Sequence, residues 1–141
     1  MKKILFVATG GTIASKKTEN GLTPQITPEE LISYIPEVEK ICEITAVQPF
    51  NLDSSNVVPE NWSMLVKVIR EHYDAFDGFI IANGTDTMAY TAAALSYMIQ
   101  NSPKSIVITG AQRPINLDIT DAKTTLSDSF YSATDDASQG V

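Results

Sequence analysis

The stretch Ile4-Leu5-Phe6-Val7-Ala8-Thr9-Gly10-Gly11-Thr12 decides the fold of this chain, because an apolar run stops abruptly at paired glycines. Such a run is typical of a buried strand that ends in a sharp turn. Thr12 follows the glycines at the carboxyl end of the strand, where α/β sheets usually carry their functional groups. The pattern recurs at Gly78–Ala82, which precedes Asn83-Gly84-Thr85-Asp86-Thr87. Together the two strand ends predict a polar site with hydroxyls, one carboxylate and backbone N–H groups.

Strands and helices are predicted to alternate along the chain. Runs of apolar and β-branched residues predict strands at 3–9, 41–50, 79–82 and 105–109. Apolar residues at helical spacing predict helices that contain Leu31, Ile32 and Ile35; Trp62, Leu65, Val66, Ile69 and Tyr73; Met88, Ala92, Leu95 and Ile99; and Ile119, Ala122, Leu126 and Phe130. This order predicts a three-layer α/β fold: a mainly parallel, flavodoxin- or Rossmann-like sheet with helices on both faces. Right-handed crossovers then place the loops that follow the strands on one edge of the sheet.

Local signals define some of the boundaries. Thr27-Pro28-Glu29-Glu30 predicts a capping box, with Thr27 as the cap and Glu30 bonding back to the cap's N–H. Pro36 is expected to end that helix. The polar segment 16–21 shows no periodicity and is predicted to be a loop.

Composition narrows the classes of function. The 141 residues suffice for one domain, and a net charge of −7, from 17 acidic and 10 basic residues, argues against a nucleic-acid surface. With one cysteine and one histidine, neither an internal disulfide nor the usual zinc site can form. We expect Cys42 to be a buried, inert thiol and His72 to be a solvated surface residue. The apolar run after Met1-Lys2-Lys3 is too short for a secretory signal or a membrane span, so the expected location is the cytoplasm.

Three of the four loops at the strand ends allow two interpretations. The first one lacks the patterns of a P-loop and of a dinucleotide fingerprint, so Thr9–Ser15 is either a tight turn or a functional loop. Asn83–Thr87 can cap a helix, or its helix end can hold a substrate carboxylate while Asp86 holds an ammonium. Asp53–Asn56 is a plausible turn. In Gly110–Pro114, Arg113 can bind an anion or make a salt bridge.

Taken together, these blocks resemble the N-terminal part of the bacterial-type L-asparaginase/glutaminase family, in its cytoplasmic branch. Thr9–Ala14, Gly84–Met88 and Thr109–Pro114 match signatures of that family in order and spacing, and Asp53-Ser54-Ser55 falls at its substrate-binding serine. The resemblance implies hydrolysis of L-asparagine, and of L-glutamine in some members, to the acid and ammonia. The reaction would pass through a threonine acyl-enzyme, without cofactor or metal, in a homodimer or homotetramer that needs neither nucleic acid nor membrane.

The resemblance also implies the role of each site residue. Thr12 is the nucleophile, and Thr85 and Asp86 belong to a second catalytic cluster. Thr85 also lies near the attacking water or the scissile carbonyl, Asp86 near the substrate ammonium and Ser54 near its α-carboxylate. The remaining implied residues are Ser55 and Ala111 for substrate binding, and the backbone N–H groups of Gly11 and Thr85 for the oxyanion.

The chain departs from the family pattern in several places. Leu22 stands where the family has a loop tyrosine, so either another residue activates Thr12 or the lid chemistry differs. Asn83 stands where a histidine is common, and this difference is expected to change local packing more than mechanism. Lys123 does not match the family's cluster lysine. We therefore expect residues 1–141 to be a partial N-terminal domain without the C-terminal domain, and to be inactive alone. An asparaginase-like subunit of a tRNA-dependent amidotransferase and a non-catalytic flavodoxin-like module are the alternatives.

Overall fold

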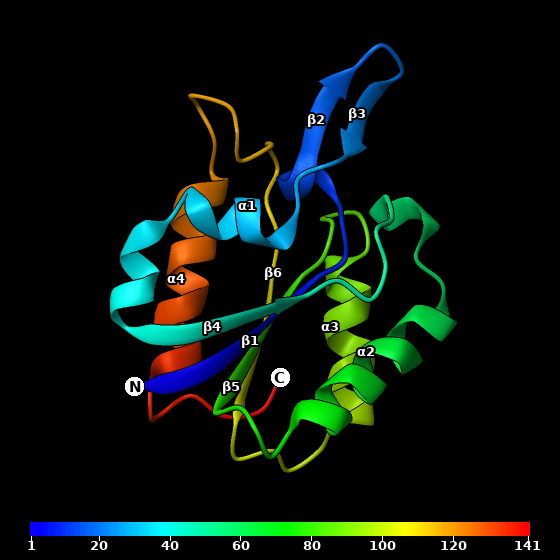
Figure 1. The fold of residues 1–141 in the computed structure, drawn as a ribbon. Coiled ribbons are helices and arrows are strands. Elements are labelled where there is room, and N and C mark those ends of the chain that lie inside the picture. Colours follow the sequence, from blue (N-terminus) through cyan, green and yellow to red (C-terminus); the bar gives the residue numbers. More distant parts are fainter.

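The computed structural model describes residues 1–141 and contains a parallel four-stranded sheet. Its strands β1 (Lys2–Ala8), β4 (Cys42–Val47), β5 (Gly78–Ala82) and β6 (Ser105–Thr109) lie in the order β4-β1-β5-β6 (Figure 1). Strand β4, which follows β1 in this sheet, lies on one side of β1, whereas β5 and β6 lie on the other side. The strand order therefore reverses between β1 and β5. Ligands of open α/β sheets bind outside the carboxyl ends of strands at such a reversal.

Helices cover both faces of the sheet, which confirms the predicted three-layer fold. On one face, α2 (Pro59–His72) and α3 (Met88–Met98) pack against the side chains of Leu5 and Val7. On the other, α1 (Pro28–Ser33) and α4 (Ala122–Thr134) pack against Ile4 and Phe6. The alternate residues of β1 thus serve two separate hydrophobic cores. No helix is both long and apolar enough to traverse a bilayer.

Several predicted boundaries hold and others move. The Thr27 hydroxyl accepts the Glu30 N–H at 3.2 Å, so Thr27 caps α1, but the Glu30 carboxylate pairs with Lys16 at 3.8 Å instead of closing the box. The predicted second strand ends at Val47, before Pro49, which has no N–H for a strand ladder. After α1, Pro36 opens a short 3₁₀ segment, η2 (Pro36–Lys40).

The start of the last helix was predicted wrongly. Ile119 is 76% exposed and precedes α4, which begins at Ala122. Its side chain therefore belongs to the loop before α4 and contributes nothing to the apolar face of that helix, which is formed by Ala122, Leu126 and Phe130.

The polar segment predicted to be a loop is an antiparallel hairpin, which corrects the sequence interpretation. Strands β2 (Ser15–Thr18) and β3 (Gly21–Pro24) pair in the register Lys17↔Leu22 and project from the carboxyl edge of the sheet (Figure 1). Gly21 has φ +97°, a conformation that residues with a Cβ rarely adopt. The pair Asn20-Gly21 is the hairpin signal that periodicity alone does not detect.

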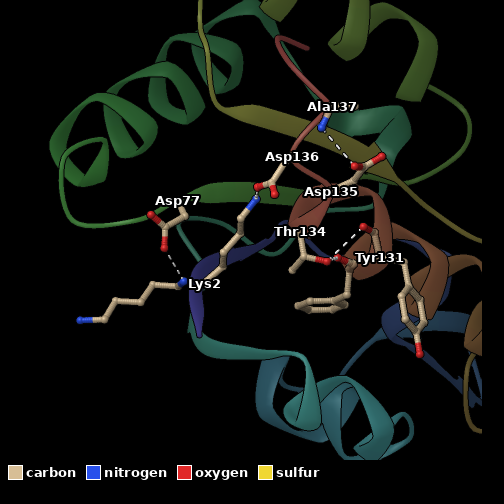
Figure 2. A network of polar contacts seen from close by, with 9 residues as sticks. Lys2, Asp77, Tyr131, Thr134, Asp135, Asp136 and Ala137 are labelled. Atoms are coloured by element: carbon tan, nitrogen blue, oxygen red, sulfur yellow. Dashed lines mark hydrogen bonds and ion pairs between the residues drawn. The ribbon is translucent and has the colours of Figure 1, made fainter.

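The opposite, amino-terminal edge of the sheet is joined to the end of the chain by polar contacts (Figure 2). Lys2 forms a 2.6 Å ion pair with Asp136, which lowers the pKa of that exposed carboxyl, and the Lys3 N–H donates to Asp77 at 2.7 Å. Beyond them, Gly140 bridges to Ser105 beside β6 in parallel orientation. The Lys2–Asp136 pair and the Gly140 bridge hold the last residues against the sheet, whereas the Lys3–Asp77 bond joins β1 to the turn before β5. All of these contacts lie far from the loops that follow the strands.

Candidate functional site

The loops after β1, β4, β5 and β6 meet so closely that glycine is required where they touch. A Cβ on Gly11 would lie 2.7 Å from the Gly84 Cα, and one on Gly84 would lie 2.4 Å from the Ser54 Cβ. A Cβ on Gly110 would lie 2.4 Å from the Asn83 carbonyl oxygen. All of these distances are shorter than any normal carbon contact, which is about 3.5–4.0 Å. The structure therefore brings together the four segments that the sequence singled out.

The loop after β1 is held by backbone hydrogen bonds to the segment after β4. The Leu52 N–H donates to the Thr9 carbonyl at 2.9 Å, and the Gly11 N–H donates to the Leu52 carbonyl at 3.0 Å. Gly11 has φ 77° and ψ −175°, a region that is essentially restricted to glycine. This geometry turns the chain sharply and places Thr12 at the start of the short 3₁₀ segment η1 (Thr12–Ala14).

Thr12 is half-buried, and two of its polar groups, the hydroxyl and the backbone N–H, are free. Neither its hydroxyl nor its backbone N–H makes a hydrogen bond within the chain. A threonine hydroxyl needs a neighbouring base to become a nucleophile. Within this chain no such base is in hydrogen-bond contact with Thr12, and Leu22, at the position of the expected tyrosine, is 51% exposed in β3.

In the segment after β4, the two serines that the resemblance assigned to substrate binding have different surroundings. Ser54 begins the 3₁₀ segment η3 (Ser54–Asn56), is 5% exposed, and lies directly against Gly84. Ser55 is exposed, and its N–H and hydroxyl donate to the Asp53 carboxylate at 3.0 and 2.9 Å. These two bonds lower the pKa of Asp53. Ser54 therefore lies among the converging loops, whereas the Ser55 side chain stabilises its own turn.

The loop after β5 presents unpaired N–H groups. The amides of Gly84, Thr85 and Asp86 have no acceptor within the chain, and α3 has no side-chain cap. Thr87 occupies the N-cap position of α3, but its side chain does not cap the helix, because the Thr87 hydroxyl donates instead to the Ser54 carbonyl at 3.1 Å. Free N–H groups at a helix N-terminus attract anions. The Thr85 hydroxyl is also without a partner, and Asp86 is exposed.

Two other implied roles meet a physical obstacle. The Gly11 N–H already donates to Leu52 and cannot also serve an oxyanion in this structure, whereas the Thr85 and Thr12 N–H groups can. The Ala111 side chain is 2% exposed and packs in the core beneath α4, so a contact with substrate would have to use its backbone.

A carboxylate near the start of α4 bonds to the backbone of the loop after β6. Asp121 accepts the N–H groups of Gln112 at 2.9 Å and Arg113 at 3.1 Å, and the Gln112 bond is the main cause of its lowered pKa. The Arg113 side chain is exposed and makes no ion pair, so of its two interpretations the salt bridge is not formed. None of the surface hollows of the molecule is lined by Thr12, Ser54 or Thr85, so the platform formed by these converging loops encloses no pocket.

Asn83 is the residue whose importance the sequence understated. It is fully buried, its N–H donates to Thr109 at 2.8 Å, and its side chain bonds to Gly84, Thr87 and Thr91. The signal in the sequence was a polar residue that directly follows an all-apolar strand, because such a buried amide needs partners.

Cys42 and His72 lie away from this platform. Cys42 is 2% exposed, which confirms that it is buried, and burial raises its pKa to about 11. His72 is half-buried and not simply solvated, because its Nδ1 lies 2.7 Å from the Val68 carbonyl in the last turn of α2.

Comparison with known proteins identifies the family. Residues 3–141 match the family model described as "Asparaginase, N-terminal". The chain is 38% identical over 141 residues to L-asparaginase 1 of Escherichia coli K12, which covers 94% of this chain and 40% of that protein. It is 39% identical over 140 residues to a subunit of the glutamyl-tRNA(Gln) amidotransferase of Archaeoglobus fulgidus, covering 98% and 33%. This chain thus spans 40% or less of the length of these two curated relatives.

Solved structures show the same relationship. L-asparaginase I of Vibrio cholerae superposes with a TM-score of 0.83 at 35% identity, covering 94% of this chain and 40% of that one. A probable cytoplasmic L-asparaginase of Campylobacter jejuni gives 0.86 at 30% identity, covering 99% and 42%. With the matching signatures gathered at one edge of a parallel sheet, this chain belongs to the asparaginase family, in the part that the family model describes as N-terminal.

Proposed function

We propose that this chain carries the nucleophile and the substrate-binding loops of an enzyme that hydrolyses L-asparagine to L-aspartate and ammonia. The Thr12 oxygen attacks the side-chain amide carbon, the C–N bond breaks, and ammonia leaves with the proton that the hydroxyl gave up. Water then cleaves the resulting ester, which releases aspartate and restores the Thr12 hydroxyl. A covalent intermediate of this kind divides one difficult step into two easier ones.

One observation carries this proposal: an unpaired threonine hydroxyl and a set of unpaired N–H groups belong to loops in direct backbone contact. Oriented N–H groups stabilise the oxyanion of acyl transfer, and loss of one donor typically costs about 10²–10³ in kcat. Among the free amides of this chain, we assign those of Thr12 and Thr85 to the oxyanion. Asp86 would hold the substrate ammonium, while Ser54 and the free end of α3 would bind its carboxylate.

The same geometry supports a role for further residues outside this chain. Thr12 has no base in hydrogen-bond contact, the platform encloses no pocket, and the chain spans 40% or less of the length of these two curated relatives. We therefore propose that residues 1–141 form an N-terminal unit of a longer enzyme, which works as a homo-oligomer, and that residues 1–141 alone have negligible activity. A cytoplasmic location is supported by the likeness to the Campylobacter protein with that description.

The decisive experiment combines substitution with chemical trapping in the full-length protein. Thr12→Ala and Thr85→Ala should each abolish asparagine hydrolysis, whereas Thr124→Ala should leave it unchanged, because Thr124 is an exposed residue of α4 whose side chain makes no hydrogen bond. With hydroxylamine present, the parent protein should form the aspartyl hydroxamate, because an acyl-enzyme is intercepted by strong nucleophiles. Near-normal turnover by Thr12→Ala, or turnover without any hydroxamate, would overturn the mechanism.

The second candidate is a component of a tRNA-dependent amidotransferase, which the identity to the Archaeoglobus protein favours. The acidic balance of the chain disfavours a direct tRNA surface on this part, because nucleic-acid affinity comes largely from basic side chains. Amidase activity that appears only when charged tRNA and a partner protein are added would establish this alternative. Full activity of the purified protein on free asparagine would exclude it.

A further inference from the structure

We propose that a one-way chain of hydrogen bonds from Trp62 to Ser54 sets the separation of two substrate-binding loops, and that Asn83 is its central positioning residue. This inference rests on the proposed function, since it assigns Ser54 and the Gly84–Asp86 loop to the same substrate. None of the linking side chains is itself assigned a chemical role.

The first half of this hydrogen-bond chain joins both helices of one layer to the end of β5. The Trp62 Nε1–H of α2 donates to the Thr91 hydroxyl of α3 at 3.0 Å. That hydroxyl donates to Asn83 Oδ1 at 3.2 Å. Thr91 and Asn83 are both fully buried, so water cannot replace either partner.

The second half joins the end of β5 to the loop after β4. The Asn83 side-chain NH₂ donates to the Gly84 carbonyl at 2.8 Å and to the Thr87 hydroxyl at 3.2 Å. The Thr87 hydroxyl then donates to the Ser54 carbonyl at 3.1 Å. Ser54 is thus drawn toward the β5 loop by Thr87, while direct contact with Gly84 limits how close it can come.

Only one direction of donation satisfies every member. An indole N–H can only donate, so Thr91 accepts from Trp62 and its own proton points to Asn83. The Ser54 carbonyl can only accept, so the Thr87 proton points to it and Thr87 accepts from the Asn83 amide. The amide is the one side chain here that accepts on one atom and donates on the other, and this explains why Asn83 occupies the centre. The orientation of that amide is assigned from these partners.

Removing a hydrogen bond from this series should weaken substrate binding and leave the chemical step unchanged. If one of these hydrogen bonds is removed, the Ser54 loop is no longer tied to the Gly84–Asp86 loop. The groups that bind the substrate's carboxylate and ammonium are then no longer held at the distance that the substrate requires. A displacement of about 1 Å can cost up to 10²-fold in an enzyme. Loss of binding that is equal in the ground and transition states raises KM and leaves kcat nearly unchanged.

The test uses isosteric variants of the full-length protein with asparagine as substrate. Thr87→Val and Thr91→Val remove a hydroxyl at nearly constant volume, and each should raise KM about 10-fold with kcat changed less than about 3-fold. Thr87→Ser and Thr91→Ser keep the hydroxyl, so the KM of each should stay near that of the parent protein. Ser96→Ala, which removes an exposed hydroxyl of α3 bonded only to its own helix, should leave both constants unchanged.

Asn83→Asp provides an independent check, because a carboxylate cannot donate to Thr87 and the series of hydrogen bonds is interrupted there. Its KM should rise as well; if that variant does not fold, the two valine variants decide. Unchanged KM in both valine variants of an active enzyme, or equal losses in the serine and valine variants, would overturn this inference alone. A parent protein that hydrolyses no asparagine would overturn the proposed function, and with it this inference.

Discussion

The contact between Gly84 and Ser54 gives the sharpest prediction, because a single methyl group tests the architecture of the site. A Cβ on Gly84 would lie 2.4 Å from the Ser54 Cβ and 2.6 Å from its hydroxyl. Carbon atoms in contact need about 3.5–4.0 Å, so Gly84→Ala must move the two loops apart by roughly 1 Å. Gly84 does not have a positive φ, so the substitution adds steric pressure without strain of that kind. Overpacking of this kind destabilises by about 1–3 kcal/mol.

A matched control is present at the opposite edge of the sheet. A Cβ on Gly78, at the start of β5, would lie 2.9 Å from the Ala133 carbonyl and 3.1 Å from the Ile4 Cδ1. Gly78→Ala should therefore lower the free energy of unfolding by a similar amount, but it should leave the Ser54 loop in place. Urea unfolding measures the first effect, and steady-state asparagine hydrolysis by the full-length protein measures the second.

We expect Gly84→Ala to raise KM by about 10- to 100-fold, in line with the cost of a displacement of about 1 Å. Gly78→Ala should keep the KM of the parent in its folded fraction. If the two variants lost stability equally and shared the same KM, the Gly84–Ser54 contact would have no part in substrate binding. A larger KM for Gly78→Ala would contradict the placement of the site at the carboxyl edge.

Other groups give predictions of their own. Lys104→Met should lower the free energy of unfolding by about 1–2 kcal/mol, because the Lys104 ammonium donates to two carbonyls beyond the end of α2. Lys67→Met, which removes an exposed ion pair, should lower it by less than about 0.5 kcal/mol. Equal losses of the two variants in urea unfolding would contradict this. The Cys42 thiol, whose pKa is raised to about 11, should react with a disulfide reagent at pH 8 no faster than the protein opens, and rapid labelling of the native protein would be inconsistent with its burial. Asp121 has a lowered pKa, so its contribution is present at neutral pH and is lost as the pH falls below about 4; Asp121→Asn should be less stable than the parent at pH 7, and the difference in urea midpoint should narrow toward pH 3 instead of staying constant.

The fold was largely predictable, because its signals are local. Strand β1 appears as an apolar run that stops at Gly10-Gly11, and α2 appears as apolar residues at helical spacing. The errors are local as well. The hairpin was missed because its strands are short and polar, so they bury little apolar surface that periodicity could reveal, although Asn20-Gly21 carried the turn signal.

The site was predicted at the level of segments and not of atoms. That the four loops would converge follows from the handedness of βαβ crossovers. The sequence could not show that the Gly11 N–H is bonded to Leu52, because the two residues meet only once β1 and β4 pair. It also could not separate Ser54 from Ser55, which differ only in the direction of their side chains.

Residue order along the chain was therefore enough to establish a parallel α/β sheet, the family signatures and the edge that carries them, because hydrophobic period, glycine pairs and caps act within a few residues. Only the folded molecule decides which N–H groups at that edge are free, that Asn83 is fully buried, and that Ser54 lies against Gly84. The reason is physical. A donor is free or bonded according to what lies within about 3 Å of it, and here those neighbours come from strands that are distant in sequence.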